Sequence, residues 1–171
     1  KFIAQCADWK ISILDLPTAF WHELAFYCVN TQTNLPSQLH SIIIGGEAVL
    51  PERVKQWRAC YGNSIALFNT YGPSETTVVA TATNLTAKKI NNTYPKLSIG
   101  QPLNNRAIAV IDDNLHILPK GEPGELLIFG AGIGDGYLHQ PEKTKEHFIQ
   151  YTLPWYATSM AYRTGDRVKI N

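Results

Sequence analysis

Short apolar runs alternate with segments of helical periodicity in the first half of the chain. Residues 11–14, 41–44 and 65–68 are mostly apolar runs of the length of a strand, and the third is expected to end at Tyr71. Strands that are mostly apolar on both faces are typical of parallel sheets, in which helices connect neighbouring strands with right-handed crossovers. The pattern therefore predicts an α/β fold with a parallel sheet and flanking helices.

Two helices are predicted between these strands, and each is opened by a proline, Pro17 or Pro51. Proline suits the first turn of a helix because an N–H at that position has no partner within the helix. Apolar residues recur in both segments at a spacing of three or four. The predicted buried faces consist of Phe20, Leu24 and Tyr27 or Cys28 in the first helix, and of Val54, Trp57 and Tyr61 in the second.

After residue 80 the pattern changes to strand-like runs separated by Gly, Asn, Asp and Pro turns. The runs are 78–85, 106–112 and 125–129, and one helical segment is predicted over 141–148. Residues 86–94 are polar and are predicted to form a surface connection. We therefore predict two parts of one larger domain, an α/β part over 1–85 and a mostly antiparallel, barrel-like β-rich part over 86–171.

Composition and charge narrow the class of protein. The chain has 171 residues, 44% of them hydrophobic, and a formal net charge of +1, which lacks the basic bias expected for nucleic-acid or membrane binding. No apolar run approaches the roughly 20 residues that span a bilayer, so a cytoplasmic setting is expected. The three cysteines are predicted to be buried free thiols. Because the chain opens on Lys1, it is expected to be a piece of a longer protein.

The three predicted strand ends indicate a ligand site. Open parallel sheets bind ligands in the crevice outside the carboxyl ends of their strands. Those ends are residues 15–19, Gly45-Gly46 and 69–71, and we expect them to lie side by side. A flat base between the Tyr71 ring and the glycine backbone fits this arrangement, although a plain strand-ending turn is the alternative interpretation.

Residues 69–77 place a ring, a hydroxyl and a carboxylate in one short segment. Gly72-Pro73 ends the strand, because proline donates no N–H and glycine adopts backbone angles that other residues avoid. The Ser74 hydroxyl can then reach a phosphate. Glu75 can supply an oxygen ligand to Mg²⁺, which prefers carboxylate and phosphate oxygens.

Several further motifs follow in a fixed order. They are residues 16–18, 42–48, 69–77, 99–102, 124–130, 134–144 and 162–166. Together these motifs resemble the adenylate-forming superfamily, and most closely the adenylation domains of nonribosomal peptide synthetases. The resemblance covers nearly the whole chain and implies the latter part of the large N-terminal subdomain.

The resemblance implies ATP or AMP and Mg²⁺ as cofactors, with a role for each matched residue. Ser74 and Glu75 are the implied catalytic residues, touching phosphate and holding Mg²⁺. The implied nucleotide contacts are Tyr71 and Asn69 on the adenine, the backbone of Gly46, Glu47 and Ala48 on its other face, and Asp166 on the ribose hydroxyls. For Asp166 the alternative is an ordinary turn residue after Thr164-Gly165.

A substrate pocket beside the nucleotide is also implied. Its matched lining is small or apolar, and consists of Ala19, Ile43, Gly45, Thr70, Val78 and Val79. An apolar substrate side chain is favoured, because an unpaired buried polar group costs roughly 1 to 3 kcal/mol. Ile43 can instead be ordinary sheet core. The implied partners are a small carboxylic or amino acid, a carrier protein with a phosphopantetheine arm, and the remainder of the adenylation domain.

The chain departs from the family pattern in some places. Asp135 and Gln140 stand where the family usually has arginine, so the role that these positive charges have in the family is not expected here. The phosphate loop and the catalytic lysine of the family match no residue here, so the chain alone is expected to form no acyl-adenylate. An acyl-CoA or aryl-acid ligase of the same superfamily, or a non-catalytic nucleotide-binding module, stays open as an alternative.

Overall fold

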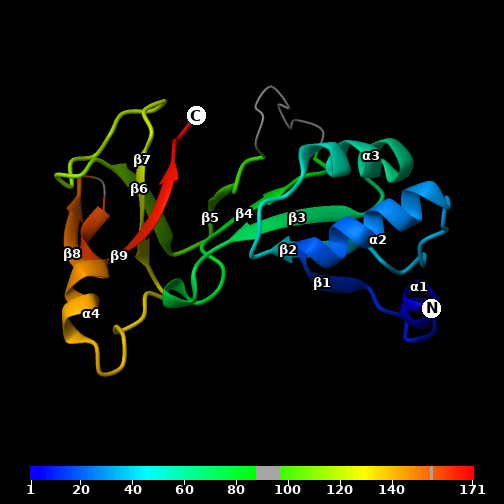
Figure 1. Cartoon of the computed structure of the whole chain (residues 1–171), viewed down its shortest axis with the longest axis horizontal. Helices are drawn as coiled ribbons and strands as arrows, with labels where there is room; N and C mark the ends of the chain where they lie inside the picture. Colours follow the sequence, from blue (N-terminus) through cyan, green and yellow to red (C-terminus); the bar gives the residue numbers. More distant parts are fainter. Residues whose placement is uncertain (88–96, 155) are drawn as a thin grey trace. The chain divides into compact units, whose positions relative to one another are not determined.

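Three parallel strands form one side of sheet A, from its edge to its middle (Figure 1). The computed structural model describes residues 1–87, 97–154 and 156–171. Within these residues, sheet A has the strand order β1-β2-β3-β4-β5. Its strands are β1 (Ile13–Pro17), β2 (Ser41–Gly45), β3 (Ala66–Tyr71), β4 (Thr81–Asn84) and β5 (Gln101–Pro102). The first three strands pair in parallel and β4 is antiparallel to β3, so the predicted parallel sheet is confirmed.

Three helices accompany this sheet in the described residues, α1 (Phe2–Asp8), α2 (Thr18–Asn30) and α3 (Pro51–Tyr61). The predicted face of α3 is confirmed, because Val54 and Trp57 are buried. The predicted face of α2 is partly wrong. Phe20 and Tyr27 are 45% and 56% exposed, and the buried positions are Trp21, Leu24, Ala25 and Cys28.

The start of α2 explains this shift. Pro17 has extended backbone angles and is both the last residue of β1 and the N-cap of α2, whereas we predicted it in the first helical turn. Helical geometry begins at Thr18, and from there Trp21 points into the core. Its ring packs edge-on against Trp57 of α3, with the ring centroids 6.0 Å apart. The core of sheet A therefore joins both helices to one face of the sheet, through Leu14, Ile42, Ile44 and Leu67.

Sheet B is antiparallel throughout its described residues, with the order β6-β7-β9-β8. Its strands are β6 (Arg106–Ile111), β7 (Gly124–Gly130), β8 (Phe148–Leu153) and β9 (Tyr156–Val168), and α4 (Pro141–His147) precedes β8. A short 3₁₀ helix, η1 (Ser74–Thr76), follows β3. The predicted order of an α/β piece and then a mostly antiparallel β-rich piece is confirmed.

Some sequence predictions differ from the structure. The strand predicted over 78–85 is only Thr81–Asn84, because Thr77 and Val78 have positive φ angles that no strand allows. We predicted neither β8 nor β9, whose polar and apolar residues follow no simple alternation. Cys6 and Cys28 are buried free thiols as expected, but Cys60 is exposed.

The chain divides into two units that interleave along the sequence. The first unit comprises residues 1–71 and 81–101, and the second comprises 72–80 and 102–171. The division at residue 85 that we predicted stays a prediction, and most of the predicted connection at 86–94 lies outside the described residues. Among the residues described, no helix is both long and apolar enough to cross a membrane.

Candidate functional site

The first unit brings the carboxyl ends of its parallel strands together. Pro17 pairs with Gly45, and Gly45 pairs with Thr70, so the three strand ends lie side by side as predicted. Two hydroxyls tie these ends to one another. Thr18 Oγ1 donates to the carbonyl oxygen of Gly45 at 3.0 Å, and Thr70 Oγ1 donates to that of Ile44 at 2.9 Å. The carboxyl ends of these strands are therefore held together by uncharged groups.

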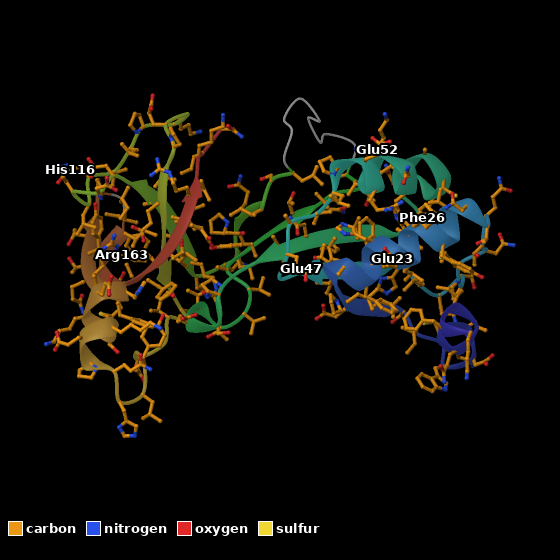
Figure 2. The ribbon with its side chains drawn as sticks, viewed as in Figure 1. Glu23, Phe26, Glu47, Glu52, His116 and Arg163 are labelled. Atoms are coloured by element: carbon orange, nitrogen blue, oxygen red, sulfur yellow. The ribbon has the colours of Figure 1, made fainter. Side chains whose placement is uncertain are left out.

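Glycine is required where β2 ends. A Cβ atom on Gly45 would lie 2.5 Å from Thr70 Oγ1, so the close approach of β2 and β3 excludes a side chain there. Gly46 has a φ of +84°, in the left-handed region that favours glycine. The exposed residues Glu47 and Ala48 follow in the loop that leads to α3 (Figure 2). The backbone of this loop is thus accessible at the sheet edge.

A histidine of α2 anchors the far end of that loop. The backbone N–H of Leu50, the N-cap of α3, donates to His22 Nε2 at 3.1 Å. Burial, and next the positive charge of Arg53, lower the pKa of His22, whereas Glu47 and Glu23 act in the opposite direction. Because an accepting Nε2 carries no proton, the neutral imidazole is the form that holds the loop.

The other predicted residues of the first unit differ in exposure. Asn69 is buried, and its amide Nδ2 donates to the carbonyl oxygen of Ser98 at 3.1 Å. Tyr71 is half-buried, and Ala19 is exposed in the first turn of α2. Ile43 is half-buried and lies on the opposite face of β2 from Ile42 and Ile44, so it is outside the helix-covered core.

In the second unit, residues 72–80 form a loop that several contacts hold in place. Arg106 Nη1 donates to the Thr76 carbonyl at 2.6 Å, and Thr77 Oγ1 donates to the Gly132 carbonyl at 2.7 Å. Thr77 and Val78 have φ angles of +56° and +61°. Such angles are strained for β-branched residues, and strain of this kind clusters at functional sites. Ser74, Val78 and Val79, which we predicted as site residues, all lie on this loop.

Glu75 is the centre of a hydrogen-bond network in this unit. The Tyr137 hydroxyl donates to Glu75 Oε1 at 2.6 Å, and the hydroxyls of Tyr137 and Tyr162 are 3.0 Å apart. The hydrogen bond from Tyr137 is the main reason that the pKa of Glu75 is lowered. Burial, and next its hydrogen-bonding partners, raise the pKa of Tyr162. At neutral pH the network therefore pairs an ionised carboxylate with protonated phenols.

The Thr164-Gly165-Asp166 segment is a bulge of β9. Glu125 pairs with Arg167 and Leu127 with Arg163, so three residues of β9 stand opposite one residue of β7. Arg163, which Figure 2 labels, contacts Glu125 Oε2 at 2.7 Å. The Gly165 N–H donates to Glu125 Oε1 at 3.1 Å. Bulges often re-aim a side chain beside an active site. Asp166 thus lies exposed on a shaped bulge, not in an ordinary turn.

The structure also identifies residues to which sequence reasoning assigned no role. Tyr137, Tyr162 and Glu125 lie within the motifs quoted above, but no spacing pattern links them to Glu75 or Asp166. Each contact joins residues more than 35 positions apart in the chain, so only the folded structure could reveal it. His22 and Arg106 carry no sequence signal for the loops that they hold.

The residues present fit a magnesium site of the kind completed by a substrate. No group of three or more His, Cys, Asp or Glu side chains gathers in the part of the chain that the structure describes. Mg²⁺ bound with nucleotides commonly has one or two protein carboxylates, and phosphate and water oxygens fill the other positions. Glu75 can supply one such ligand.

Comparison with known proteins gives consistent matches. A family model described as AMP-binding enzyme matches residues 1–138. The isonitrile lipopeptide synthase of Streptomyces coeruleorubidus is 40% identical over 169 residues, which are 99% of this chain and 10% of that protein. Tyrocidine synthase 2 of Brevibacillus parabrevis is 37% identical over 166 residues, 97% of this chain and 4% of that protein. The chain therefore spans a tenth or less of these relatives.

Solved structures share the fold at lower identity. The N-terminal subdomain of NpsA from Klebsiella oxytoca, in complex with 3-hydroxybenzoyl-AMSN, matches with a TM-score of 0.82 and 23% identity, over 98% of this chain and 41% of that chain. PA1221, an NRPS protein containing adenylation and PCP domains, matches with a TM-score of 0.82 and 20% identity, over 96% of this chain and 32% of that chain. These matches show that both units belong to one known fold.

Proposed function

The chain belongs to the AMP-binding enzyme family, and from this we propose that it is part of an enzyme that activates a carboxylic acid as an acyl-adenylate. The resemblance to adenylation domains of nonribosomal peptide synthetases is confirmed by the relatives and by the fold. The proposed substrate is an amino acid, and the proposed acceptor is the phosphopantetheine thiol of a carrier protein. The cytoplasmic setting stays a prediction.

The observation that carries the proposal is the ionised Glu75 on its strained, tightly held loop. Adenylation requires a carboxylate to attack the α-phosphate of ATP while pyrophosphate leaves, so phosphate charge has to be neutralised. Mg²⁺ would supply part of the positive charge that this requires. Glu75 would be its protein ligand, and Ser74 would contact a phosphate. A carboxylate held by a phenol donor, next to an exposed hydroxyl, suits both tasks.

The first unit suits recognition of the uncharged parts of the ligands. We propose that Tyr71, Asn69 and the backbone of residues 46–48 bind adenine. Ala19, Ile43, Gly45 and Thr70 are the proposed pocket residues of this unit, and Val78 and Val79 those of the second. The exposed Asp166 on its bulge is proposed to accept hydrogen bonds from the ribose hydroxyls, since a carboxylate accepts two.

None of these proposed contacts comes from a lysine or arginine side chain at the transferring phosphate. Preorganised charge at that position is usually the largest catalytic term. We therefore expect the 171-residue chain to form no acyl-adenylate alone, and the activity has to be measured on the complete adenylation domain.

The proposal is tested by Glu75→Gln in that complete domain. This change removes the charge of a metal ligand and keeps its shape, so Mg²⁺-dependent ATP–pyrophosphate exchange should slow about a hundredfold, equivalent to roughly 3 kcal/mol. Glu142→Gln is the matched control, because Glu142 is exposed on α4 and pairs only with Lys145 in the described contacts.

The assay also separates the alternatives. Exchange that depends on amino acids supports the proposal, whereas exchange with aryl acids alone would favour an aryl-acid ligase. ATP binding without any exchange would favour a non-catalytic module. Unchanged exchange in Glu75→Gln, with a lowered melting temperature, would make Glu75 structural.

A further inference from the structure

The phenols next to Glu75 form a directed chain of hydrogen bonds. A tyrosine hydroxyl has one proton, and that of Tyr137 is donated to Glu75 Oε1 at 2.6 Å. At the 3.0 Å contact between the two phenols, Tyr162 therefore has to be the donor and Tyr137 the acceptor. The order is Tyr162 to Tyr137 to Glu75. Hydrogen bonds in such chains polarise and strengthen one another.

The chain of hydrogen bonds restrains the side chain of Glu75, and a separate contact restrains the Glu75 backbone. The Gly134 N–H donates to the Glu75 carbonyl oxygen at 2.8 Å. The Tyr137 contact then sets the rotation of the carboxylate, because it holds one of the two oxygens. Glu75 thus presents its carboxylate in a defined orientation, with both anchors in the same segment around residues 134–137.

Tyr137 is itself held in place by α4 and by neighbouring rings. Its backbone N–H donates to Thr144 Oγ1 at 2.9 Å, and any Cβ on Gly136 would collide with Thr144. The Phe148 ring packs edge-on against the Tyr137 ring with centroids 5.5 Å apart, and Lys143 Nζ lies 4.4 Å from the Tyr137 ring centroid. The phenol oxygen therefore has little freedom to leave Glu75.

Tyr162 is held as firmly as Tyr137. It is buried in β9, its ring stacks on His147 with centroids 5.9 Å apart, and it also packs against Phe148 at 5.0 Å. The hydroxyl is therefore carried by a strand of sheet B and not by a loop. Through Tyr137, a rigid strand supports a carboxylate that lies on the 3₁₀ helix η1.

We propose that Tyr137 is a positioning residue that orients Glu75 for the metal ion, with Tyr162 as its support. The inference rests on the proposed function, in which Glu75 is a Mg²⁺ ligand. Carboxylates that bind metals are usually hydrogen-bonded in turn, and loss of such a partner typically lowers metal affinity or activity 10- to 100-fold. A merely structural tyrosine would change stability without changing the metal requirement.

The experiment uses the complete adenylation domain with Tyr137→Phe, Tyr162→Phe and Tyr151→Phe. Tyr151→Phe is the matched control, because its hydroxyl donates to the Leu115 carbonyl at 2.6 Å in the same unit and makes no described contact with Glu75. Two readouts are compared: the Mg²⁺ concentration for half-maximal pyrophosphate exchange, and Mn²⁺ binding in the presence of ATP by electron paramagnetic resonance. Melting temperatures report stability separately.

We expect Tyr137→Phe to raise the required Mg²⁺ concentration about tenfold and to weaken Mn²⁺ binding by a similar factor. Tyr162→Phe should act in the same direction by a smaller factor, about threefold, because the short hydrogen bond from Tyr137 to Glu75 remains in that variant. Tyr151→Phe should lower the melting temperature and leave both metal readouts unchanged. If Tyr137→Phe does not fold, Tyr162→Phe decides the question.

Equal metal readouts in Tyr137→Phe, Tyr162→Phe and Tyr151→Phe would overturn the inference and leave the proposed function intact. A wild-type domain without exchange would instead contradict the proposed function. In that case the Mn²⁺ measurement still tests whether Tyr137 orients Glu75.

Discussion

The two units hold their candidate site residues in different ways. In the first unit, an apolar core with the buried rings of Trp21 and Trp57 supports a sheet edge that hydroxyls and backbone groups tie together. In the second unit, the core of sheet B is smaller, and charged groups and phenols fix the candidate residues Glu75 and Asp166. The first arrangement suits a flat uncharged ligand, and the second suits metal, phosphate and ribose.

This difference has a physical reason. A flat base is recognised by shape and by backbone groups, and apolar packing positions these without any buried charge. A carboxylate that is to bind a metal has to stay ionised and oriented, and this requires hydrogen-bond donors aimed at it. The stability of the first unit should therefore respond most to apolar truncation, and that of the second to the loss of polar partners.

The largest expected effect is the loss of a core ring in the first unit. Trp57→Ala removes a fully buried side chain and should destabilise α2 and α3 by about 3 to 5 kcal/mol. Trp9→Ala is the control, because Trp9 is 68% exposed, and its effect should stay within about 0.5 kcal/mol. Hydrogen exchange of individual peptides in the intact protein measures the loss of stability in both variants. Similar loss of protection in the two variants would contradict the comparison.

An intermediate effect is expected from the polar contacts of the second unit. Arg163→Gln removes the charged partner of Glu125, whose side chain also binds the Gly165 N–H of the bulge. Because this pair is largely shielded, with 30% and 19% of the two side chains exposed, we expect a loss of about 1 to 2 kcal/mol in β7 and β9.

Lys145→Gln removes a pair on α4 whose side chains are 74% and 86% exposed, and it should change stability by less than about 0.5 kcal/mol. Hydrogen exchange of the peptides from β7 and β9 compares the two variants. If the β7 and β9 peptides are as well protected from hydrogen exchange in Arg163→Gln as in Lys145→Gln, the bulge does not depend on the charged pair.

The smallest expected effect is a pH dependence in the first unit. The fold lowers the pKa of His22, so the unfolded state takes up a proton first as the pH falls below about 6.5. The contribution of the neutral ring is therefore complete above that pH, and it is lost as the pH falls toward the lowered pKa. Protection factors of residues 46–54 should drop between pH 7.5 and 5.5.

His22→Gln should flatten this drop, because a glutamine oxygen can accept the Leu50 N–H and does not titrate. His40→Gln is the control in the same unit, since His40 is exposed and bonds to Ser41. An equal drop in the wild type and in His22→Gln would show that another group causes the pH dependence.

Sequence alone predicted the fold class, the three parallel strands with their adjacent carboxyl ends, and the family. The strands and helices behind these predictions are encoded locally, because apolar runs, prolines at helix starts and glycines at strand ends act on neighbouring residues. At the start of α2 we predicted Phe20 on the buried face, but Trp21 is the buried residue. The prediction placed Pro17 in the first helical turn, whereas Pro17 is the N-cap because β1 extends to it. Strand β9 was missed because its bulge interrupts any period of two.

Only the tertiary structure decided how the candidate residues are held. The contacts of Tyr137 with Glu75, of Glu125 with Gly165 and of His22 with Leu50 each join distant parts of the chain. No periodicity specifies such pairs, because one hydrogen bond constrains only two positions and leaves the surrounding pattern unchanged. The sequence determined which residue types occur at the strand ends and in the motifs, and the folded chain determined which partner orients each of them.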